Sequence, residues 1–169
     1  MTHMIKAIFI IASLGLTACT NPDQLAGGNG TGSGSGAGGV NDPASNPRSV
    51  AYFNQTIGDR VLFAVDTSTL TPEGRTTLSG QAKWLMDNPE YAAIIEGHAD
   101  EQGTREYNLA LGARRANAVA EFLISQGIAG SRLRTLTYGK ERPIEVCSAE
   151  ACYAKNRRAV TVISAGAGA

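Results

Sequence analysis

The chain of 169 residues carries 15 Lys and Arg residues against 15 Asp and Glu residues, so its formal net charge at pH 7 is zero. Nucleic-acid-binding proteins usually carry a basic excess, and this balance argues against a nucleic-acid partner. The length is sufficient for one domain of about 110 residues with appendages, and a domain of that size can bury a hydrophobic core.

The first 18 residues have the features of an export signal. Lys6 supplies positive charge, and an apolar run follows it from Ala7 to Leu16. This run is too short to span a bilayer as a helix, and small residues come after it, as in signal peptides. The signal ends with Leu16, Thr17 and Ala18, directly before Cys19. Small residues before a cysteine resemble the lipobox of bacterial lipoproteins. In those proteins the cysteine is diacylated and becomes the first mature residue; an ordinary secretory signal with an unrelated cysteine is the alternative.

The predicted lipid anchor at Cys19 leads into a linker. Two acyl chains give stable membrane attachment, whereas a single chain supports only marginal binding. Thr20 occupies the position where inner-membrane lipoproteins usually carry aspartate, so the resemblance implies an outer-membrane protein that faces the periplasm. Residues 19–47 are rich in Gly, Ser, Asn and Pro and have almost no apolar content. They are predicted to form a disordered linker with a root-mean-square span of about 30 Å.

Residues 48–163 are predicted to fold as one domain, and residues 164–169 to form a disordered tail. The domain is expected to start with a short helix that stops at Gly58. The apolar residues that follow predict a buried strand over 61–64.

The next helix has a clear start and a clear end. A capping hydroxyl at Thr71, Pro72 in the first turn and the acidic Glu73 all favour a helix N-terminus. Asn88, followed by a proline, ends the helix. A second strand is predicted over 92–99.

The turn after this strand leads into a long helix with polar residues along one line. Asp100 follows the strand, and Asn108, Gly112 and Arg115 lie on the helix. At about 100° per residue, Asn108 and Arg115 fall within about 20° of each other, whereas Arg114 points about 120° away from Asn108. Asp100 could bind an ammonium group and Arg115 a carboxylate, so the set suits a small zwitterion. An ion pair that only ties the turn to the helix is the alternative.

The same helix has an apolar stripe at spacings of four and three, made of Leu109, Ala113, Ala116, Ala120 and Leu123. This spacing predicts the face that packs on the core. Asn108 and Arg115 border the stripe and are therefore expected at the rim of the domain, where a ligand can reach them. Leu111 could form a wall of the ligand site or be ordinary packing. Gly127 is predicted to end the helix as a left-handed cap.

The C-terminal part adds two strands and a short helix. A third strand is predicted over 133–138, a short helix over 149–156, and a fourth strand over 158–163 with Val160 and Val162 pointing inward. The order βαβαβ(α)β predicts an α+β two-layer fold, with helices on one face of a mixed four-stranded sheet.

Cys147 and Cys152 remain after export, and an oxidising compartment favours a disulfide between them. Its closed loop is short, so its expected contribution to stability is only about 2 kcal/mol. His98 is the only histidine left after signal cleavage, and two Cys with one His at this spacing do not match a zinc site. We expect no metal and no cofactor.

The run GHADEQGTREYNLALGARRANAVAEFL, followed by YGKERP and NRRAV, resembles the OmpA-like peptidoglycan-binding domain over about residues 54–163. In that family the aspartate of the GHxD turn and the second arginine of the RRA run grip diaminopimelate of the cell-wall peptide. Those positions are Asp100 and Arg115. The resemblance also places the loop aspartate Asp66 at the ligand site, and Ala99 departs from the more usual threonine or asparagine. The expected ligand-binding set is Asp66, Asp100, Asn108, Leu111, Gly112 and Arg115.

Three classes of function are compatible with these features. A non-catalytic tether between the outer membrane and peptidoglycan fits the lipobox, the linker and the single domain. This organisation resembles the lipoproteins of the Tol–Pal envelope and cell-division system, which implies periplasmic Tol proteins as further partners. A wall-cleaving enzyme would use two carboxylates from among Glu96, Asp100 and Glu101 as its catalytic pair. A general acid usually needs burial to raise its pKa, whereas this turn is polar. A protein-interaction module without a wall ligand is the third class; the tether is preferred.

Overall fold

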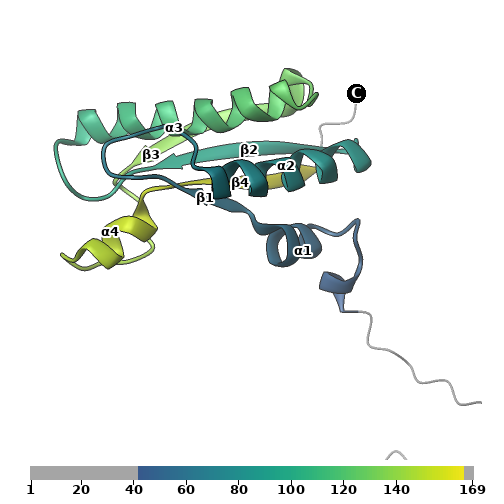
Figure 1. Ribbon diagram of the computed structural model, residues 1–169, viewed down its shortest axis with the longest axis horizontal. Coiled ribbons are helices and arrows are strands. Elements are labelled where there is room, and N and C mark those ends of the chain that lie inside the picture. The colour runs from purple at the N-terminus through teal and green to yellow at the C-terminus, as the bar shows by residue number, and fades with distance from the viewer. Residues whose placement is uncertain (1–41, 166–169) are drawn as a thin grey trace, which may run out of the picture. The chain divides into compact units, whose positions relative to one another are not determined.

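The computed structural model describes residues 42–165 of the chain (Figure 1). The predicted signal peptide, the predicted lipidation at Cys19 and residues 19–41 of the predicted linker lie outside the described residues, as do residues 166–169. Within the described part, no helix is both long enough and apolar enough to cross a membrane.

Strands and helices alternate in the predicted order. The elements are η1 (Pro43–Ser45), α1 (Val50–Tyr52), the π-helical turn η2 (Phe53–Gly58), β1 (Arg60–Leu62), α2 (Pro72–Asp87), β2 (Tyr91–His98), α3 (Arg105–Ser125), η3 (Gly130–Arg132), β3 (Leu133–Gly139), α4 (Glu150–Asn156) and β4 (Arg158–Ala165). The Thr71 hydroxyl accepts a hydrogen bond from the Gly74 amide at 3.0 Å, which confirms the predicted start of α2. Gly127 has φ +102° and lies just past the end of α3, as predicted.

The four strands form one mixed sheet in the order β1-β4-β2-β3. β4 runs antiparallel to both β1 and β2, and β2 runs parallel to β3. Helices α2 and α3 pack on one face of the sheet (Figure 1), where residues such as Leu85, Ile95 and Leu123 share a single buried core. The predicted α+β fold with a mixed four-stranded sheet is therefore confirmed.

Three details of the predicted strands are wrong. Val162 is 38% exposed, whereas Ala159 and Thr161 are each 2% exposed, so the predicted inward alternation is on the wrong residues of β4. The inward face must fit beneath the helices, and the smaller side chains take it while the valines lie on the open face. β1 is also shorter than predicted, and its Leu62 is 49% exposed. β4 extends to Ala165, two residues into the predicted tail.

The buried face of α3 differs from the predicted apolar stripe. It consists of Asn108, Leu111, Gly112, Arg115, Ala116, Val119, Ala120 and Leu123. Leu109 and Ala113, which were predicted to be in the core, are only half-buried. The polar Asn108 and Arg115 therefore lie in the middle of the buried face and not at its border, because loops that follow β1 and β2 cover this end of the helix.

Two glycines allow α3 to lie directly on the sheet. A Cβ atom on Gly97 of β2 would overlap the carbonyl oxygen of Gly112, and a Cβ on Gly112 would lie 2.8 Å from the Gly97 carbonyl oxygen.

We predict that Gly97→Ala lowers the free energy of unfolding by about 3 kcal/mol, because the helix backbone cannot move without disturbing the core. Denaturant unfolding measures the change. Gly130→Ala is the matched control, since its nearest neighbour would be Ile124 Cδ1 at 3.7 Å; equal stability of the two variants would contradict the close packing.

Candidate functional site

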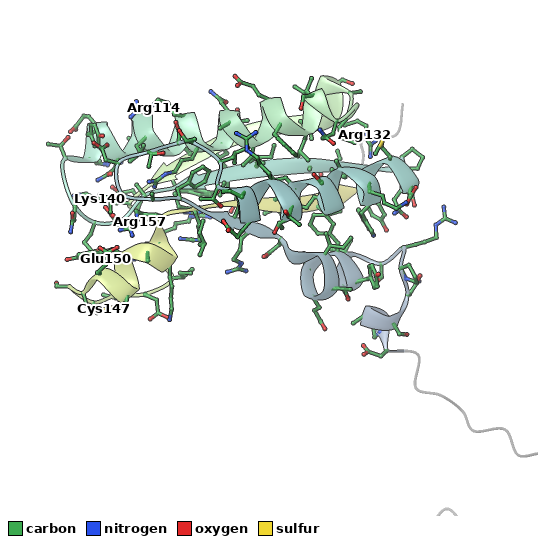
Figure 2. All side chains as sticks on the ribbon, viewed as in Figure 1. Arg114, Arg132, Lys140, Cys147, Glu150 and Arg157 are labelled. Atoms are coloured by element: carbon green, nitrogen blue, oxygen red, sulfur yellow. A yellow bond between two sulfur atoms is a disulfide. The ribbon has the colours of Figure 1, made fainter. Side chains whose placement is uncertain are left out.

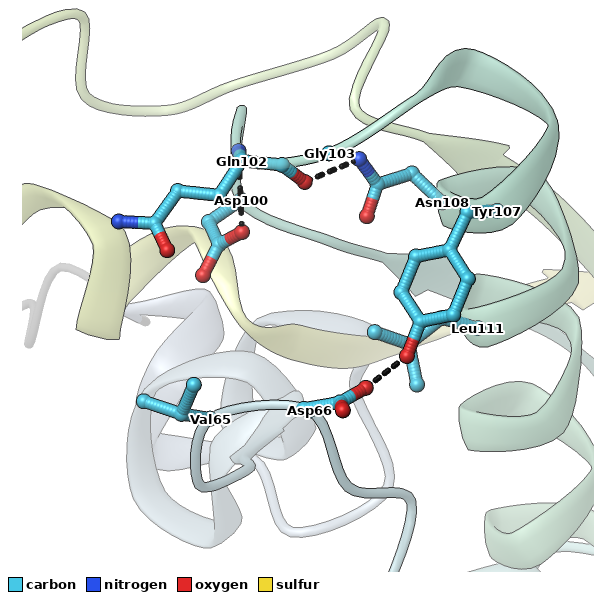
Figure 3. A pocket seen from close by; sticks show the side chains of 8 residues that line it. All are labelled: Val65, Asp66, Asp100, Gln102, Gly103, Tyr107, Asn108 and Leu111. Carbon is cyan, nitrogen blue, oxygen red and sulfur yellow. Dashed lines mark hydrogen bonds between the residues drawn. The ribbon is translucent and has the colours of Figure 1, made fainter.

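A pocket of about 250 Å³ lies at the end of the sheet where β2 leads into α3 (Figure 3). Its lining consists of Val65, Asp66, Asp100, Gln102, Gly103, Tyr107, Asn108 and Leu111. The structure therefore brings together four of the six residues expected at the ligand site, namely Asp66, Asp100, Asn108 and Leu111. Arg115 and Gly112 are not part of this lining.

The turn that carries Asp100 is fixed by local hydrogen bonds. The Gln102 amide donates to Asp100 Oδ1 at 3.2 Å, and Asn108 Nδ2 donates to the Gln102 carbonyl oxygen at 2.7 Å (Figure 3). Gly103 has φ +87°, a conformation that glycine adopts without strain. Thr104 then caps α3 by accepting a hydrogen bond from the Tyr107 amide. These contacts hold the acidic turn against the first turns of the helix.

The pocket is rich in hydrogen-bond acceptors. Asp66, at φ +54° in the loop after β1, accepts a hydrogen bond from the Tyr107 hydroxyl across the pocket (Figure 3). Asn108 is 1% exposed, and its Oδ1 has no hydrogen-bond partner among the described residues. This oxygen has almost no accessible surface, so a ligand in the pocket cannot reach it in this arrangement of side chains. The two carboxylates of the lining suit an ammonium group.

Arg115 does not lie at the rim of the domain, and this prediction is wrong. Its side chain is fully buried, and its guanidinium donates to the carbonyl oxygens of Thr67, His98 and Ala64 at 2.8, 2.8 and 3.2 Å. Burial lowers the pKa of Arg115 to about 10, while Asp100 opposes the shift, so the group stays charged at pH 7. Arg115 thus ties the loop after β1 to the end of β2, and its positive charge interacts with the pocket residues Asp100 and Asp66.

Gly112 was expected to leave empty space for a ligand, and this prediction is also wrong. The strand backbone occupies that space, since the Gly97 carbonyl of β2 and the Thr137 side chain of β3 lie against Gly112. The glycine serves the packing of the helix on the sheet.

Arg157 is the arginine that contacts Asp100, and no role was predicted for it. Its Nη1 lies 3.1 Å from Asp100 Oδ2, and both side chains are almost completely buried. The NRRAV run that contains Arg157 is visible in the sequence, but its neighbours depend on strand order. Because β4 runs antiparallel beside β2, the residue before β4 lies next to the residues after β2.

The predicted disulfide is present in the structure. Cys147 and Cys152 are bonded to each other, with their Cα atoms 6.0 Å apart. Asn156 holds the same segment from the other end of α4, because its Oδ1 accepts hydrogen bonds from the Ile144 and Glu145 amides. In residues 42–165, no group of three or more His, Cys, Asp or Glu side chains is arranged to hold a metal ion.

His98 is buried beside the pocket turn, as a packing residue. It is 2% exposed, and neither ring nitrogen has a hydrogen-bond partner among the described residues. Burial, together with the positive charges of Arg158 and Arg142, lowers the pKa of His98 to about 4. The imidazole is therefore neutral in the folded protein at neutral pH.

This histidine predicts a loss of stability in mild acid. In the unfolded chain His98 binds a proton near its ordinary pKa of about 6.5, so the unfolded state gains protons first as the pH falls. The contribution of neutral His98 is fully present above pH 6.5 and is lost as the pH approaches 4. The free energy of unfolding should fall by on the order of 2 kcal/mol more for the wild type than for His98→Phe between pH 7 and 4.5. Parallel curves for the two proteins would contradict the neutral, buried imidazole.

Comparisons with known proteins identify the family of the chain. Residues 62–157 match the model of the OmpA family. The chain is 48% identical over 162 residues to the peptidoglycan-associated lipoprotein of Brucella melitensis, covering 96% of this chain and 92% of that protein. It is 47% identical over 167 residues to that of Mesorhizobium japonicum, covering 98% and 92%. The crystal structure of the peptidoglycan-associated lipoprotein from Burkholderia pseudomallei aligns with a TM-score of 0.64 at 34% identity, over 73% of this chain and all of that one. The chain therefore belongs to the OmpA family and, within it, to the peptidoglycan-associated lipoproteins.

Proposed function

We propose that this protein binds peptidoglycan non-covalently through the distal amino-acid head of diaminopimelate, and thereby tethers the outer membrane to the cell wall. The observation that carries the proposal is the pocket that brings the carboxylates of Asp66 and Asp100 together near the buried charge of Arg115. A pocket of about 250 Å³ suits one amino-acid head group better than a larger ligand.

The ammonium group of the ligand is assigned to the acceptors. Asp100 supplies the negative charge and accepts only one amide and one arginine hydrogen bond, so lone pairs remain for the ligand. Asn108 contributes indirectly, because its Nδ2 donates to the Gln102 carbonyl oxygen and so holds the turn that carries Asp100. Asp66 lies across the pocket, where Tyr107 already donates to it. Leu111 forms an apolar wall for the aliphatic part of the diaminopimelate side chain.

The distal carboxylate is assigned to positive charge near the pocket. Arg115 cannot contact a ligand directly in this arrangement of side chains, because it is fully buried. Its field nevertheless reaches the pocket, since the lining residues Asp100 and Asp66 both act on its pKa. Arg157 is already paired with Asp100 and Glu150, so Arg115 is the cation assigned to this carboxylate. A charge in a poorly solvated site interacts more strongly with a ligand than it would in water.

A binding role fits the carboxylates better than hydrolysis of the wall. Asp100 is ion-paired with Arg157. Glu96 lies outside the pocket lining and accepts a hydrogen bond from the Tyr138 hydroxyl instead. A glycosidase needs two carboxylates that face one bond from opposite sides. Glu96 and Asp100 do not share the pocket in this way.

Co-sedimentation of the purified protein with isolated sacculi tests the proposal. The protein should pellet with sacculi whose stem peptides contain diaminopimelate and should stay in the supernatant with lysine-type walls. Release of soluble wall fragments would favour the enzyme, and equal pelleting with both walls would contradict recognition of diaminopimelate. The organisation of the chain also supports periplasmic Tol proteins as further partners within a Tol–Pal system.

The proposed outer-membrane anchor depends on Cys19. We predict that Cys19→Ser releases the protein into the periplasm or leaves it unprocessed, because a serine cannot carry the thioether-linked lipid. Cell fractionation followed by salt washing measures the outcome. If the variant still fractionates with the outer membrane, lipid is not the anchor.

A further inference from the structure

Arg157 is shared between two carboxylates on opposite sides of it. Toward the pocket, its Nη1 lies 3.1 Å from Asp100 Oδ2. Toward solvent, its Nη2 pairs with Glu150 at the start of α4, and its Nη1 lies 3.5 Å from the other Glu150 oxygen. Figure 2 shows Glu150 and Arg157 side by side at the end of the sheet where α4 lies. Asp100 therefore receives only part of the hydrogen-bonding capacity of this guanidinium.

Glu150 is held in place by the segment that surrounds it. It lies inside the loop closed by the disulfide between Cys147 and Cys152. α4 spans only seven residues, and a helix of that length is not stable by itself in water. Its position therefore depends on the disulfide at one end and on the hydrogen bonds of Asn156 at the other.

We propose that the disulfide-closed segment positions Glu150 as a specificity-determining residue, which holds part of Arg157 away from Asp100 and so keeps Asp100 available for the ammonium group of the ligand. This inference rests on the proposed binding of diaminopimelate.

The charges of the three groups explain the expected effect. With Glu150 in place, two carboxylates share one guanidinium, and the cluster retains a net negative charge that attracts an ammonium. Without Glu150, both terminal nitrogens of the guanidinium are available to pair with the two oxygens of Asp100, while Nε still donates to the Phe63 carbonyl oxygen. Pairing through two nitrogens is the preferred geometry of an arginine with a single carboxylate. Asp100 would then be neutralised and have fewer lone pairs for the ligand.

The test compares Glu150→Gln with a matched variant from the same segment. Glu145 is a partly exposed carboxylate of the same segment, but it pairs with Lys155 at 2.8 Å and not with Arg157. In calorimetry with a diaminopimelate peptide, Glu150→Gln should weaken binding about three- to tenfold, whereas Glu145→Gln should stay within about twofold of the wild type. Glu150→Asp, which retains the charge, should recover part of the loss.

A second arm tests the role of the disulfide. The double variant Cys147→Ser/Cys152→Ser should also bind more weakly, and adding Glu150→Gln to it should cause little further loss, because both changes act through the same contact. A peptide whose distal amino group is replaced by hydrogen should show no loss with Glu150→Gln, which a merely structural role would not predict.

If the wild type binds the diaminopimelate peptide but Glu150→Gln binds equally well, the role of Glu150 is wrong and the proposed function stands. Additive losses in the combined variant would overturn the role of the disulfide. If the wild type does not bind the peptide, the proposed function itself is wrong.

Discussion

Replacing Arg115 by alanine is expected to lower the free energy of unfolding by about 3–5 kcal/mol and to weaken ligand binding as well. The guanidinium donates to three backbone carbonyls that belong to two separate segments, the loop after β1 and the end of β2. Alanine leaves these acceptors without their donor and leaves a cavity in a fully buried site. The loop that carries Asp66 would lose its attachment to α3, and the pocket would lose the positive charge near it.

Arg114→Ala is the matched control, because Arg114 is the exposed neighbour on the same helix. Its guanidinium lies 5.9 Å from the centre of the Tyr107 ring, a contact of modest strength at an exposed site. Denaturant unfolding of the two variants and the wild type measures the difference. A loss in Arg114→Ala as large as that in Arg115→Ala would contradict the structural role of Arg115. Lysine at position 115 should rescue little, since its ammonium cannot reach three carbonyls in a fixed planar geometry.

Removing the carboxylate of Asp100 is expected to reduce binding of diaminopimelate by about 2–4 kcal/mol, or roughly thirty- to thousand-fold. Asp100 supplies the charge for the ligand ammonium, and charge-assisted hydrogen bonds are stronger than neutral ones. Asp100→Asn keeps the size of the side chain and an acceptor for the Gln102 amide, so the variant tests charge with little change in shape. Calorimetry with the wall peptide measures the loss.

Glu101→Ala provides the control for Asp100, because Glu101 is the neighbouring acidic residue and does not line the pocket. Its backbone carbonyl accepts from Lys140, and this contact survives the substitution. We expect Glu101→Ala to bind within about twofold of the wild type. Similar losses in both variants would mean that the general negative charge of the turn, and not the position of Asp100, controls binding.

Local signals in the sequence predicted the elements of the fold well. The caps at Thr71 and Gly127 depend on interactions within a few residues, and both are present in the structure. Asp100, Asn108 and Leu111 were brought together by the spacing of a strand, a turn and a helix, and all three line the pocket. The inward face of β4 was predicted wrongly, because either set of alternating residues could point inward. The sequence offers Val160 and Val162 on one face, and Ala159 and Thr161 on the other. The smaller pair faces the helices.

The roles of the arginines depend on contacts between distant segments. Arg115 lies on the predicted line with Asn108, but a count of apolar spacings cannot show that a charged residue is buried in the middle of that face. Its partners are backbone carbonyls, which carry no sequence signal. Arg157 contacts Asp100 only because β4 lies between β1 and β2. Gly112 was read as an opening for a ligand, whereas a glycine opposite Gly97 equally allows a helix to approach a strand.

Calorimetry with two stem peptides that differ only at their third residue tests the central claim most directly. The diaminopimelate peptide carries both an ammonium and a carboxylate at its distal carbon, whereas the lysine peptide carries the ammonium alone. We predict that the lysine peptide binds at least about tenfold more weakly, because it has no carboxylate for the positive charge of Arg115 to stabilise. Equal affinities for the two peptides would contradict the assignment of this pocket to diaminopimelate.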